Sequence, residues 1–301
     1  KYIFYNVRIL FVMSAVDYLT LLRPHQWIKN LFLVAPMLFS FNLTLYNIIK
    51  VFEGILIFSL CASAVYVFND IHDLNEDRQH PEKSKRPIAS GEISISTAFI
   101  LTIIIYSISL GLAWWLNKGF FSVIIVYTIL NILYTLKLKH IPILDIVIIA
   151  IGFILRLYAG AALIDVDVSM WIVLVTFLLA LFLILAKRRD EYLHYVNGKI
   201  VRKNIDGYNL DFLNAGMVLL ATVTLVSYIM YTVSPDVITR IGSDKLYLTT
   251  GFVIVGILRY MQLTFVYGNS GSPTKLLLKD VFLQIDIILW LLSFYVIHLI
   301  G

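Results

Sequence analysis

The chain has 301 residues, of which 60% are hydrophobic and 14% carry a charge, and its mean hydropathy is +0.86. A soluble domain of this length has too little interior to bury so many apolar side chains, since ordinary proteins are nearer half apolar. The net charge of +5 comes from basic residues interleaved with acids in short polar segments, which is typical of membrane-adjacent loops. The composition therefore predicts an integral membrane protein and excludes a soluble enzyme and a nucleic-acid-binding protein.

Apolar runs that are long enough to cross a bilayer follow one another through the whole chain, each near the roughly 20 residues that a membrane helix needs. They lack the alternating pattern of β-barrel strands and leave no room for a second soluble domain. We expect an all-α membrane protein in which a single domain, 1–301, forms a nine-transmembrane-helix bundle. The predicted spans are 26–46, 48–68, 95–116, 119–136, 141–163, 169–186, 211–232, 246–267 and 280–300.

The distribution of basic residues predicts the orientation of these spans. Of the 24 Lys and Arg residues, 18 lie on one side of the predicted topology, and this count includes the four in residues 1–29. The positive-inside rule places that side and the amino terminus in the cytoplasm, and the carboxyl terminus outside. Residues 1–17 are expected to form an interfacial or extension segment, in which Met13 is a candidate translation start. The single cysteine, Cys61, falls in a span and can form no internal disulfide.

The segment after the second span, residues 69–91, reads NDIHDLNEDRQHPEKSKRPIASG. If the second helix continues beyond the membrane edge, Asn69, Asp73 and Asp77 recur at four-residue spacing along one helical face, and Asp70 can join them. Carboxylates held so close repel one another, so a sequence that keeps them together favours a bound cation. Oxygen ligands favour Mg²⁺, which retains waters and shares its shell with phosphates.

Basic residues follow these acids at His80, Lys83, Lys85 and Arg86. Fixed positive charge beside a carboxylate–Mg²⁺ site is what a diphosphate needs, because the metal bridges some oxygens while Lys and Arg neutralise the rest. The alternative is a solvated, self-paired loop that only sets topology. The ordered run of acids followed by bases favours the diphosphate site.

A second charged segment, residues 187–208, follows the sixth span. Lys187 and Glu191 are four residues apart, so they share a helical face that could look toward the first charged segment. Arg189 is interpreted as an ordinary basic cap at a cytoplasmic helix end.

Other polar groups lie at or inside the membrane. Tyr134, Lys137 and Lys139 end the fourth span, either as phosphate ligands or as snorkelling anchors. Gln26, Lys29 and Asn30 enter the bilayer edge on one face of the first span.

Arg156 is costly inside a span unless it is paired or lines a polar cavity, and Arg259 and Asp286 are expected to pair with each other.

The motif NDxxDxxxD followed by HPxKxxRPIASG, within nine predicted helices, resembles the UbiA-type prenyltransferase superfamily. That resemblance implies a helix bundle around a polar cavity, with cytosolic cap loops whose two acidic motifs hold Mg²⁺ and a diphosphate. The second motif departs from this pattern, since residues 186–192 read AKRRDEY. From about residue 18 to 295, the segments LLRPHQWIKN, GFILRLYAG, KRRDE and GILRY resemble one branch, the decaprenyl-phosphate phosphoribosyltransferases.

This branch resemblance implies Mg²⁺-dependent transfer of a 5-phosphoribosyl group from phosphoribosyl pyrophosphate to a polyprenyl (decaprenyl-type) phosphate in cell-wall biosynthesis. The donor carries an additional 5-phosphate, so a site for it should hold more cations, as the replacement of a second acidic pair by Lys187 and Arg188 suggests. The expected metal ligands are Asn69, Asp70, Asp73 and Asp77. The expected catalytic residues are Asp73, Asp77, Lys83, Arg86, Lys187 and Glu191, and the expected substrate-binding residues are Lys29, Asn30, Tyr134, Lys137, Arg156 and Arg188.

Two other functions fit parts of the pattern. A more ordinary member of the superfamily would move a prenyl group from an allylic diphosphate to an aromatic or lipid acceptor, but the incomplete second acidic set argues against it. A transporter would have helices broken at mid-membrane and charges spread through the spans, whereas the charges here concentrate in loops on one side. A purely structural membrane protein would not need the acidic motif. Lipid-facing and helix-facing apolar residues look alike, so the sequence makes no prediction of oligomeric state.

Overall fold

The computed structural model describes residues 16–198, 203–268 and 273–300, and all regular elements within these ranges are helices. Eight described helices are long and apolar enough to cross a membrane, which confirms an all-α, multi-pass membrane protein. Most of the predicted segment 1–17 lies outside the described residues. The spanning helices are α3 (Leu45–His72), α6 (Ile95–Leu116), α7 (Lys118–Leu136), α8 (Leu144–Leu163), α9 (Met170–Val196), α10 (Leu210–Thr232), Lys245–Phe265 (η5, Lys245–Thr249, with α12, Thr250–Phe265) and α14 (Val281–Ile300).

The first predicted span, 26–46, is not one long α-helix. It is divided into the 3-10 helix η1 (Pro24–Val34) and the short α2 (Ala35–Phe39). Proline has no backbone N–H, so a continuous α-helix through Pro36 would lose the bond to the carbonyl of residue 32. Phe41 then adopts a positive φ of 55°, which ends the helical segment.

The η1 segment runs antiparallel to α3. Trp27 donates to the Ser63 hydroxyl at 3.0 Å, and one turn further along, Asn30 donates to the Ser59 hydroxyl at 2.9 Å. Residue numbers rise along η1 as they fall along α3, so the two segments pass each other in opposite directions.

The chain divides into two compact units, each described here by itself. Unit 1 comprises Lys1–Ile141 and Leu155–Val168, and unit 2 comprises Pro142–Ile154 and Ser169–Gly301, so α8 contributes residues to both. The short elements of unit 1 are α4 (Leu74–Gln79), η2 (Lys83–Lys85), α5 (Pro87–Ser90) and η3 (Leu138–His140). Those of unit 2 are η4 (Lys203–Gly207), α11 (Pro235–Ile241) and α13 (Pro273–Lys279).

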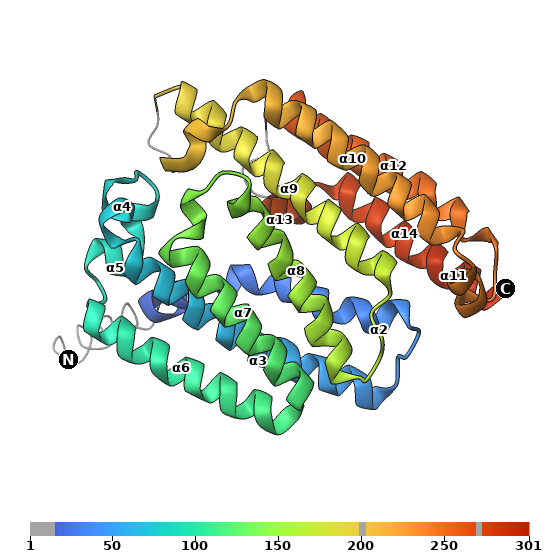
Figure 1. The fold of residues 1–301 in the computed structure, drawn as a ribbon, viewed down its shortest axis with the longest axis horizontal. Coiled ribbons are helices and arrows are strands. Elements are labelled where there is room, and N and C mark those ends of the chain that lie inside the picture. Colours follow the sequence, from blue (N-terminus) through green and yellow to red (C-terminus); the bar gives the residue numbers. More distant parts are fainter. Residues whose placement is uncertain (1–15, 199–202, 269–272, 301) are drawn as a thin grey trace, which may run out of the picture. The chain divides into compact units, whose positions relative to one another are not determined.

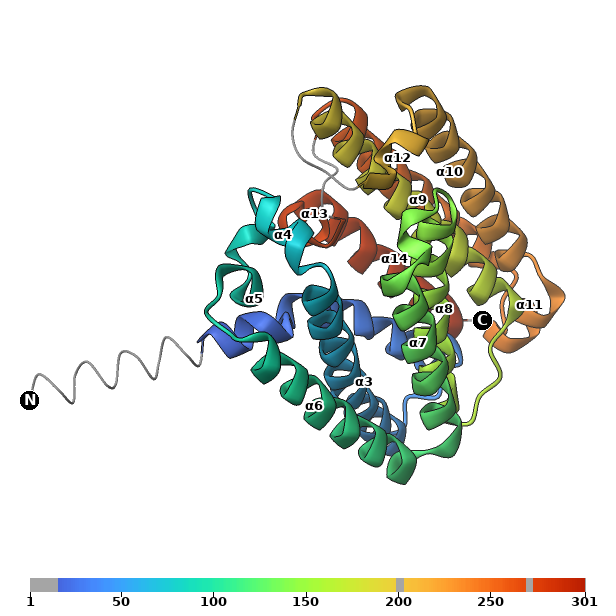
Figure 2. The same ribbon diagram turned by 60° about the vertical axis from the view of Figure 1, so that its left-hand side comes forward.

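In unit 1, α3 is the central helix and packs against η1, α6 and α7. Its core includes Phe58 and Cys61 of α3 with Phe120 and Ile124 of α7, all of them buried. Figures 1 and 2 both show α4 and α5 gathered at the carboxyl end of α3, beyond the long helices. The polar end of unit 1 is therefore a small helical cap rather than an open loop.

In unit 2, α9 and α10 form the most extensive helix pair, and α12 packs on both α10 and α14. The buried core lies between these helices and includes Phe182, Leu213, Met217 and Tyr260. Figure 1 shows α9 and α10 side by side.

Small polar residues define where five spanning helices begin. Thr44, Ser94, Asn117, Ser169 and Asn209 each accept a hydrogen bond on the side chain from a backbone N–H two or three residues further on. Such caps satisfy donors that the first helical turn leaves without partners. The helix starts in this membrane protein are therefore fixed by the same local chemistry as in soluble proteins.

Candidate functional site

The acidic motif lies where α3 gives way to α4. Helix α3 ends at His72, Asp73 links it to α4 with φ −88° and ψ 7°, and the Asp77 N–H still donates to the Asp73 carbonyl at 2.8 Å. The four-residue spacing suggested one unbroken helix through the motif, but the structure interrupts the helix at Asp73. The break is confined to one residue, so Asn69, Asp70, Asp73 and Asp77 remain within two successive turns.

A single guanidinium joins two of these carboxylates. Nη1 of Arg86 lies 2.9 Å from Oδ1 of Asp70 and 2.5 Å from Oδ2 of Asp77. Both carboxylates are almost completely buried, and Asp70 also forms an ion pair with Arg23. Arg23 in turn stacks over the Tyr66 ring at 5.4 Å.

The third carboxylate belongs to a separate chain of contacts. Asp73 forms an ion pair with Lys139, which is 66 residues away in sequence and 9% exposed. Asn69 donates to Oδ2 of Asp73 at 3.2 Å, and the Thr135 hydroxyl donates to the side-chain oxygen Oδ1 of Asn69 at 3.2 Å. The end of α7 and the following η3 thus hold the end of α3.

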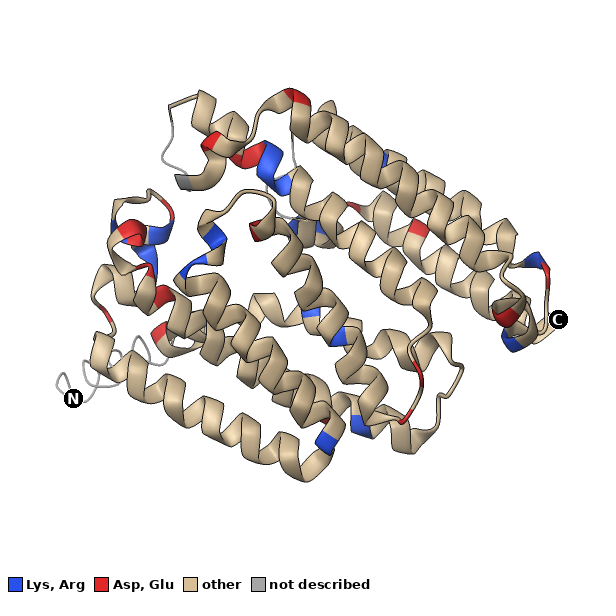
Figure 3. Ribbon diagram, viewed as in Figure 1, with Lys and Arg blue, Asp and Glu red and all other residues tan. Residues whose placement is uncertain are grey.

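Bases outnumber carboxylates in this cluster. Arg23, Lys83, Arg86 and Lys139 surround Asp70, Asp73 and Asp77, and Figure 3 shows positive and negative segments meeting at this end of unit 1. Burial raises the pKa of Asp77, although the charges of Arg86 and Lys83 oppose that shift.

His80 follows α4 at its carboxyl end. Its Nδ1 accepts from the backbone N–H of Glu82 at 3.2 Å. Burial lowers the pKa of His80, and the neighbouring charges of Lys83 and Arg86 lower it further.

The donor set suits a hard divalent cation. Three carboxylates and one amide supply oxygen atoms only, which is the chemistry that Mg²⁺ prefers. Among the described residues no three His, Cys, Asp or Glu side chains are close enough to hold a metal as they stand. Instead, a guanidinium nitrogen lies between Asp70 and Asp77, where it supplies the positive charge that a metal ion would bring. The residues therefore fit Mg²⁺ by chemistry, with Arg86 in a cation's position.

A second polar cluster of unit 1 surrounds Arg156. Its Nε donates to the Asn30 side-chain oxygen at 2.9 Å and its Nη2 to the Tyr127 hydroxyl at 3.2 Å. The guanidinium also lies 5.1 Å from the ring centroids of both Phe58 and Tyr127. Arg156 is thus a buried cation held by neutral polar and aromatic groups, with half-buried Lys29 next to Asn30 in η1.

In unit 2 the KRRDE segment belongs to α9, which continues to Val196, rather than to a loop. Arg188 is 1% exposed, and its Nε donates to Asp145 at 2.9 Å while its Nη1 lies 2.5 Å from Glu191. Asp145 also accepts from Asn204 at 2.9 Å and from the Tyr208 hydroxyl at 2.6 Å. Lys187, nearly half exposed, lies 3.9 Å from Glu191.

Sequence reasoning found part of these clusters. The structure brings Asp70 and Asp77 together with Lys83 and Arg86, and it brings Asn69 to Asp73 in a separate set of contacts. It also brings Asn30 to Arg156 and Arg188 to Glu191. Tyr134 is half-buried and Lys137 exposed at the end of α7, where Lys139 is the lysine that contacts the acidic motif. Contacts that sequence reasoning missed include those of Arg23 and Lys139 in unit 1 and those of Asp145, Asn204 and Tyr208 in unit 2.

One predicted pair is wrong. Arg259 pairs with Asp280 at 2.8 Å rather than with Asp286. Asp280 also accepts the backbone N–H of Leu283, so it caps the start of α14. A cap residue directly before an apolar run was the signal that could have identified it.

Comparison with known proteins connects this geometry to a family. The model of the UbiA prenyltransferase family matches residues 26–197. The decaprenyl-phosphate phosphoribosyltransferase of Mycolicibacterium smegmatis is 33% identical over 281 residues, covering 89% of this chain and 88% of that protein. The digeranylgeranylglyceryl phosphate synthase of Saccharolobus solfataricus is 27% identical, covering 94% and 99%.

The fold is also similar to that of solved UbiA homologues. A UbiA homologue from Archaeoglobus fulgidus, solved bound to GPP and Mg²⁺, superimposes with a TM-score of 0.68 at 22% identity, covering 94% of this chain and 99% of that one. The family match spans the acidic motif and the KRRDE segment, the two charged regions around which the clusters form. The chain is therefore a multi-pass membrane transferase of the UbiA prenyltransferase family.

Proposed function

We propose that the protein transfers a 5-phosphoribosyl group from phosphoribosyl pyrophosphate to a polyprenyl phosphate, with Mg²⁺ as cofactor and pyrophosphate as the second product. The observation that carries this proposal is the excess of bases at the acidic motif, where four cationic side chains contact three carboxylates. A donor that bears a 5-phosphate in addition to its pyrophosphate has more charge to neutralise than an allylic diphosphate. The similarity to decaprenyl-phosphate phosphoribosyltransferases over 89% of the chain supports the same assignment.

In the proposed reaction, an oxygen of the lipid phosphate forms a bond to the anomeric carbon of the ribose. The bond from that carbon to the pyrophosphate oxygen breaks, and pyrophosphate leaves with the electron pair. A phosphate monoester is ionised at neutral pH, since its second pKa is about 6, so the reaction needs no strong general base. Bound Mg²⁺ would offset charge on the leaving pyrophosphate.

The side chains have separable proposed roles. Asn69, Asp70, Asp73 and Asp77 would hold the metal, and Lys83 and Arg86 would bind phosphate oxygens and stabilise negative charge on the leaving group. We assign Lys29, Asn30, Tyr134, Lys137 and Arg156 to the remaining phosphates of donor or acceptor. Lys187 is assigned to phosphate binding and Glu191 to the ribose hydroxyls. Arg188, bound to both Asp145 and Glu191, would act by positioning Glu191.

We further propose that η1 and α2 form a ninth crossing and that the amino terminus is cytoplasmic. A 3-10 helix rises about 2.0 Å per residue and an α-helix about 1.5 Å. The eleven residues of η1 and five of α2 therefore extend close to the thickness of the hydrocarbon core, about 30 Å. Their antiparallel course along α3 supports this topology. With nine crossings the acidic motif faces the cytoplasm, where water-soluble phosphoribosyl pyrophosphate is available.

The test uses purified protein in detergent with Mg²⁺, a long-chain polyprenyl phosphate and phosphoribosyl pyrophosphate labelled in the ribose. Label is expected to move into the organic phase and to stay in the aqueous phase when EDTA removes the metal. Asp73→Asn removes one metal-binding charge without changing side-chain size and should abolish the transfer. Asp236→Asn, the same change at an exposed position of α11, is the matched control and should retain it.

Prenyl transfer from an allylic diphosphate is the competing activity, favoured by the likeness to the digeranylgeranylglyceryl phosphate synthase. It is tested by supplying geranylgeranyl diphosphate with an aromatic or a lipid-alcohol acceptor. Metal-dependent consumption of the allylic donor, with no transfer of labelled ribose, would overturn the proposed function and return the chain to prenyl transfer.

A further inference from the structure

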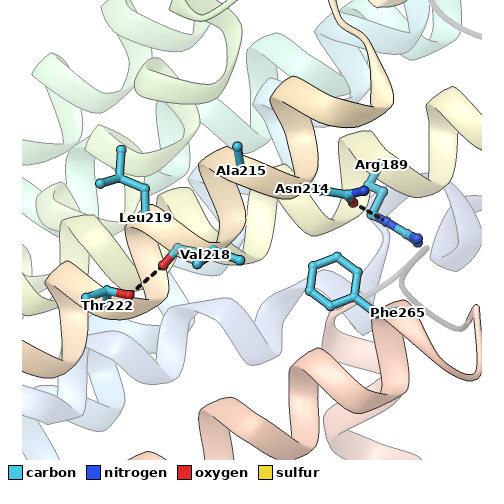
Figure 4. A pocket seen from close by; sticks show the side chains of 7 residues that line it. All are labelled: Arg189, Asn214, Ala215, Val218, Leu219, Thr222 and Phe265. Atoms are coloured by element: carbon cyan, nitrogen blue, oxygen red, sulfur yellow. Dashed lines mark hydrogen bonds between the residues drawn. The ribbon is translucent and has the colours of Figure 1, made fainter.

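An apolar groove on unit 2 ends at a buried arginine. One wall is a face of α10 with residues at helical spacing, namely Ala215, Val218, Leu219 and Thr222. Arg189 of α9, Asn214 of α10 and Phe265 of α12 lie together at one end, as Figure 4 shows. Val218 and Leu219 are 49% and 62% exposed, so in a spanning helix this groove faces lipid.

Among the described residues, the arginine at the end of the groove forms no ion pair, although the charge of the neighbouring Asp190 acts on it. Arg189 is only 8% exposed. Its Nε donates to the Asn214 side-chain oxygen at 2.8 Å, its Nη1 donates to the Thr264 carbonyl at 3.0 Å, and its guanidinium lies 5.0 Å from the centroid of the Phe265 ring. All three partners are neutral. Among the ion pairs between described residues none includes Arg189, whereas the adjacent Arg188 has two.

Arg189 also points away from the Arg188 cluster. Successive residues of an α-helix are about 100° apart around its axis, so Arg188 faces Asp145 of α8 while Arg189 faces α10 and α12. The next residue, Asp190, lies 3.6 Å from His194. The groove is thus separate from the groups that the proposed function uses in unit 2.

We infer that this groove binds an anionic membrane phospholipid, with the headgroup phosphate on Arg189 and an acyl chain along Ala215, Val218, Leu219 and Thr222. A buried guanidinium whose direct contacts are all neutral is costly in a low-dielectric environment, and phosphate is an anion that matches its planar fork of donors. Thr222 is seven positions beyond Ala215 in α10, a length of about 10 Å that suits an extended hydrocarbon chain. A zwitterionic lipid carries its own ammonium and would leave the excess charge uncompensated.

The experiment is native mass spectrometry of the full-length protein in detergent, titrated with phosphatidylglycerol or phosphatidylcholine. The wild type is expected to bind one phosphatidylglycerol about tenfold more tightly than phosphatidylcholine. Arg189→Gln should remove that preference, while Arg240→Gln, the same change at an exposed residue of α11, should keep it. Ala215→Trp fills the groove from an exposed position and leaves Arg189 intact, so it should weaken phosphatidylglycerol binding even if Arg189→Gln proves too unstable to purify.

Three results would overturn the inference. The first is equal binding of the two lipids by the wild type. The second is an undiminished preference in folded Arg189→Gln or Ala215→Trp protein. The third is displacement of bound phosphatidylglycerol by an equimolar polyprenyl phosphate, which would replace the bilayer phospholipid with a different occupant.

Discussion

Lys137 and Lys139 are two residues apart in sequence but lie in different environments. Lys139 is buried against Asp73, and Lys137 is exposed where α7 ends. A buried ammonium attracts a carboxylate that it contacts more strongly than an ammonium in water does, because solvent screens the exposed charge. Of the two lysines, Lys139 is therefore the one whose charge matters most to the acidic motif.

Replacing each lysine by methionine tests this difference. Lys139→Met leaves Asp73 without its cation, so kcat/KM for the transfer should fall on the order of 100-fold. Lys137→Met should cost less than about tenfold, because solvent screens the phosphate contact that we propose for this exposed lysine. The label-transfer assay measures kcat/KM for both variants, and a thermal unfolding curve checks that each variant is folded. An equal loss at both positions would contradict the greater weight given to the Asp73–Lys139 ion pair.

The residue-scale predictions from sequence were good where partners are close along the chain. The contact between Asn69 and Asp73 was predictable because helical spacing alone brings these two side chains together. Arg23 and Lys139 were not assigned to the motif, since they are 47 and 66 residues from their carboxylate partners. No periodicity reports a contact between distant segments, so these partners follow from tertiary packing alone.

At the scale of elements, Gly160 is the point where α8 comes closest to η1. A Cβ atom added at Gly160 would lie 2.0 Å from the backbone carbonyl oxygen of Leu33, a distance that no real contact shows. A small residue at a helix contact lets two backbones approach, which is a common device in membrane bundles. The position of η1 in unit 1 therefore depends on the absence of a side chain at residue 160.

Gly160→Ala should lower stability, because one of the two backbones must move. Overpacking of this kind typically costs about 1–3 kcal/mol, which corresponds to a fall in Tm of several degrees, on the order of 5 °C. The matched control is Gly111→Ala in α6, where nothing lies within 4 Å of the added Cβ. Differential scanning fluorimetry in detergent compares the two variants, and an unchanged Tm for Gly160→Ala would contradict the close approach.

Eight of the nine predicted spans appear as long helices because hydropathy over 20 residues is a strong local signal. The exception, 26–46, follows Pro24 and contains Pro36, and its first part lies in the 3-10 helix Pro24–Val34. The cap at α4 and α5 was described as a loop because its helices are only four to six residues long. Segments this short carry too few residues for a periodic pattern.

At the scale of the whole molecule, the proposed orientation can be tested through the single cysteine. Cys61 is fully buried, so the natural chain should give little background with a membrane-impermeant maleimide. Glu92→Cys and Asp244→Cys introduce exposed thiols at residues that the proposed topology places on opposite sides of the membrane. In spheroplasts, Asp244→Cys should be labelled directly and Glu92→Cys only after permeabilisation. The reverse pattern would place the acidic motif outside the cell.

Arg86 gives the acidic motif an internal competitor. Because its Nη1 contacts both Asp70 and Asp77, a cation that arrives there must displace a guanidinium tethered at high effective concentration. If Mg²⁺ binds there as we propose, weakly binding monovalent ions should be kept out and the net affinity for a divalent ion should be reduced. The displaced guanidinium would then need an anion, so a metal that arrives together with a polyphosphate would satisfy both groups at once. Under the proposed function, the arrangement therefore favours the joint entry of metal and donor over the entry of either alone.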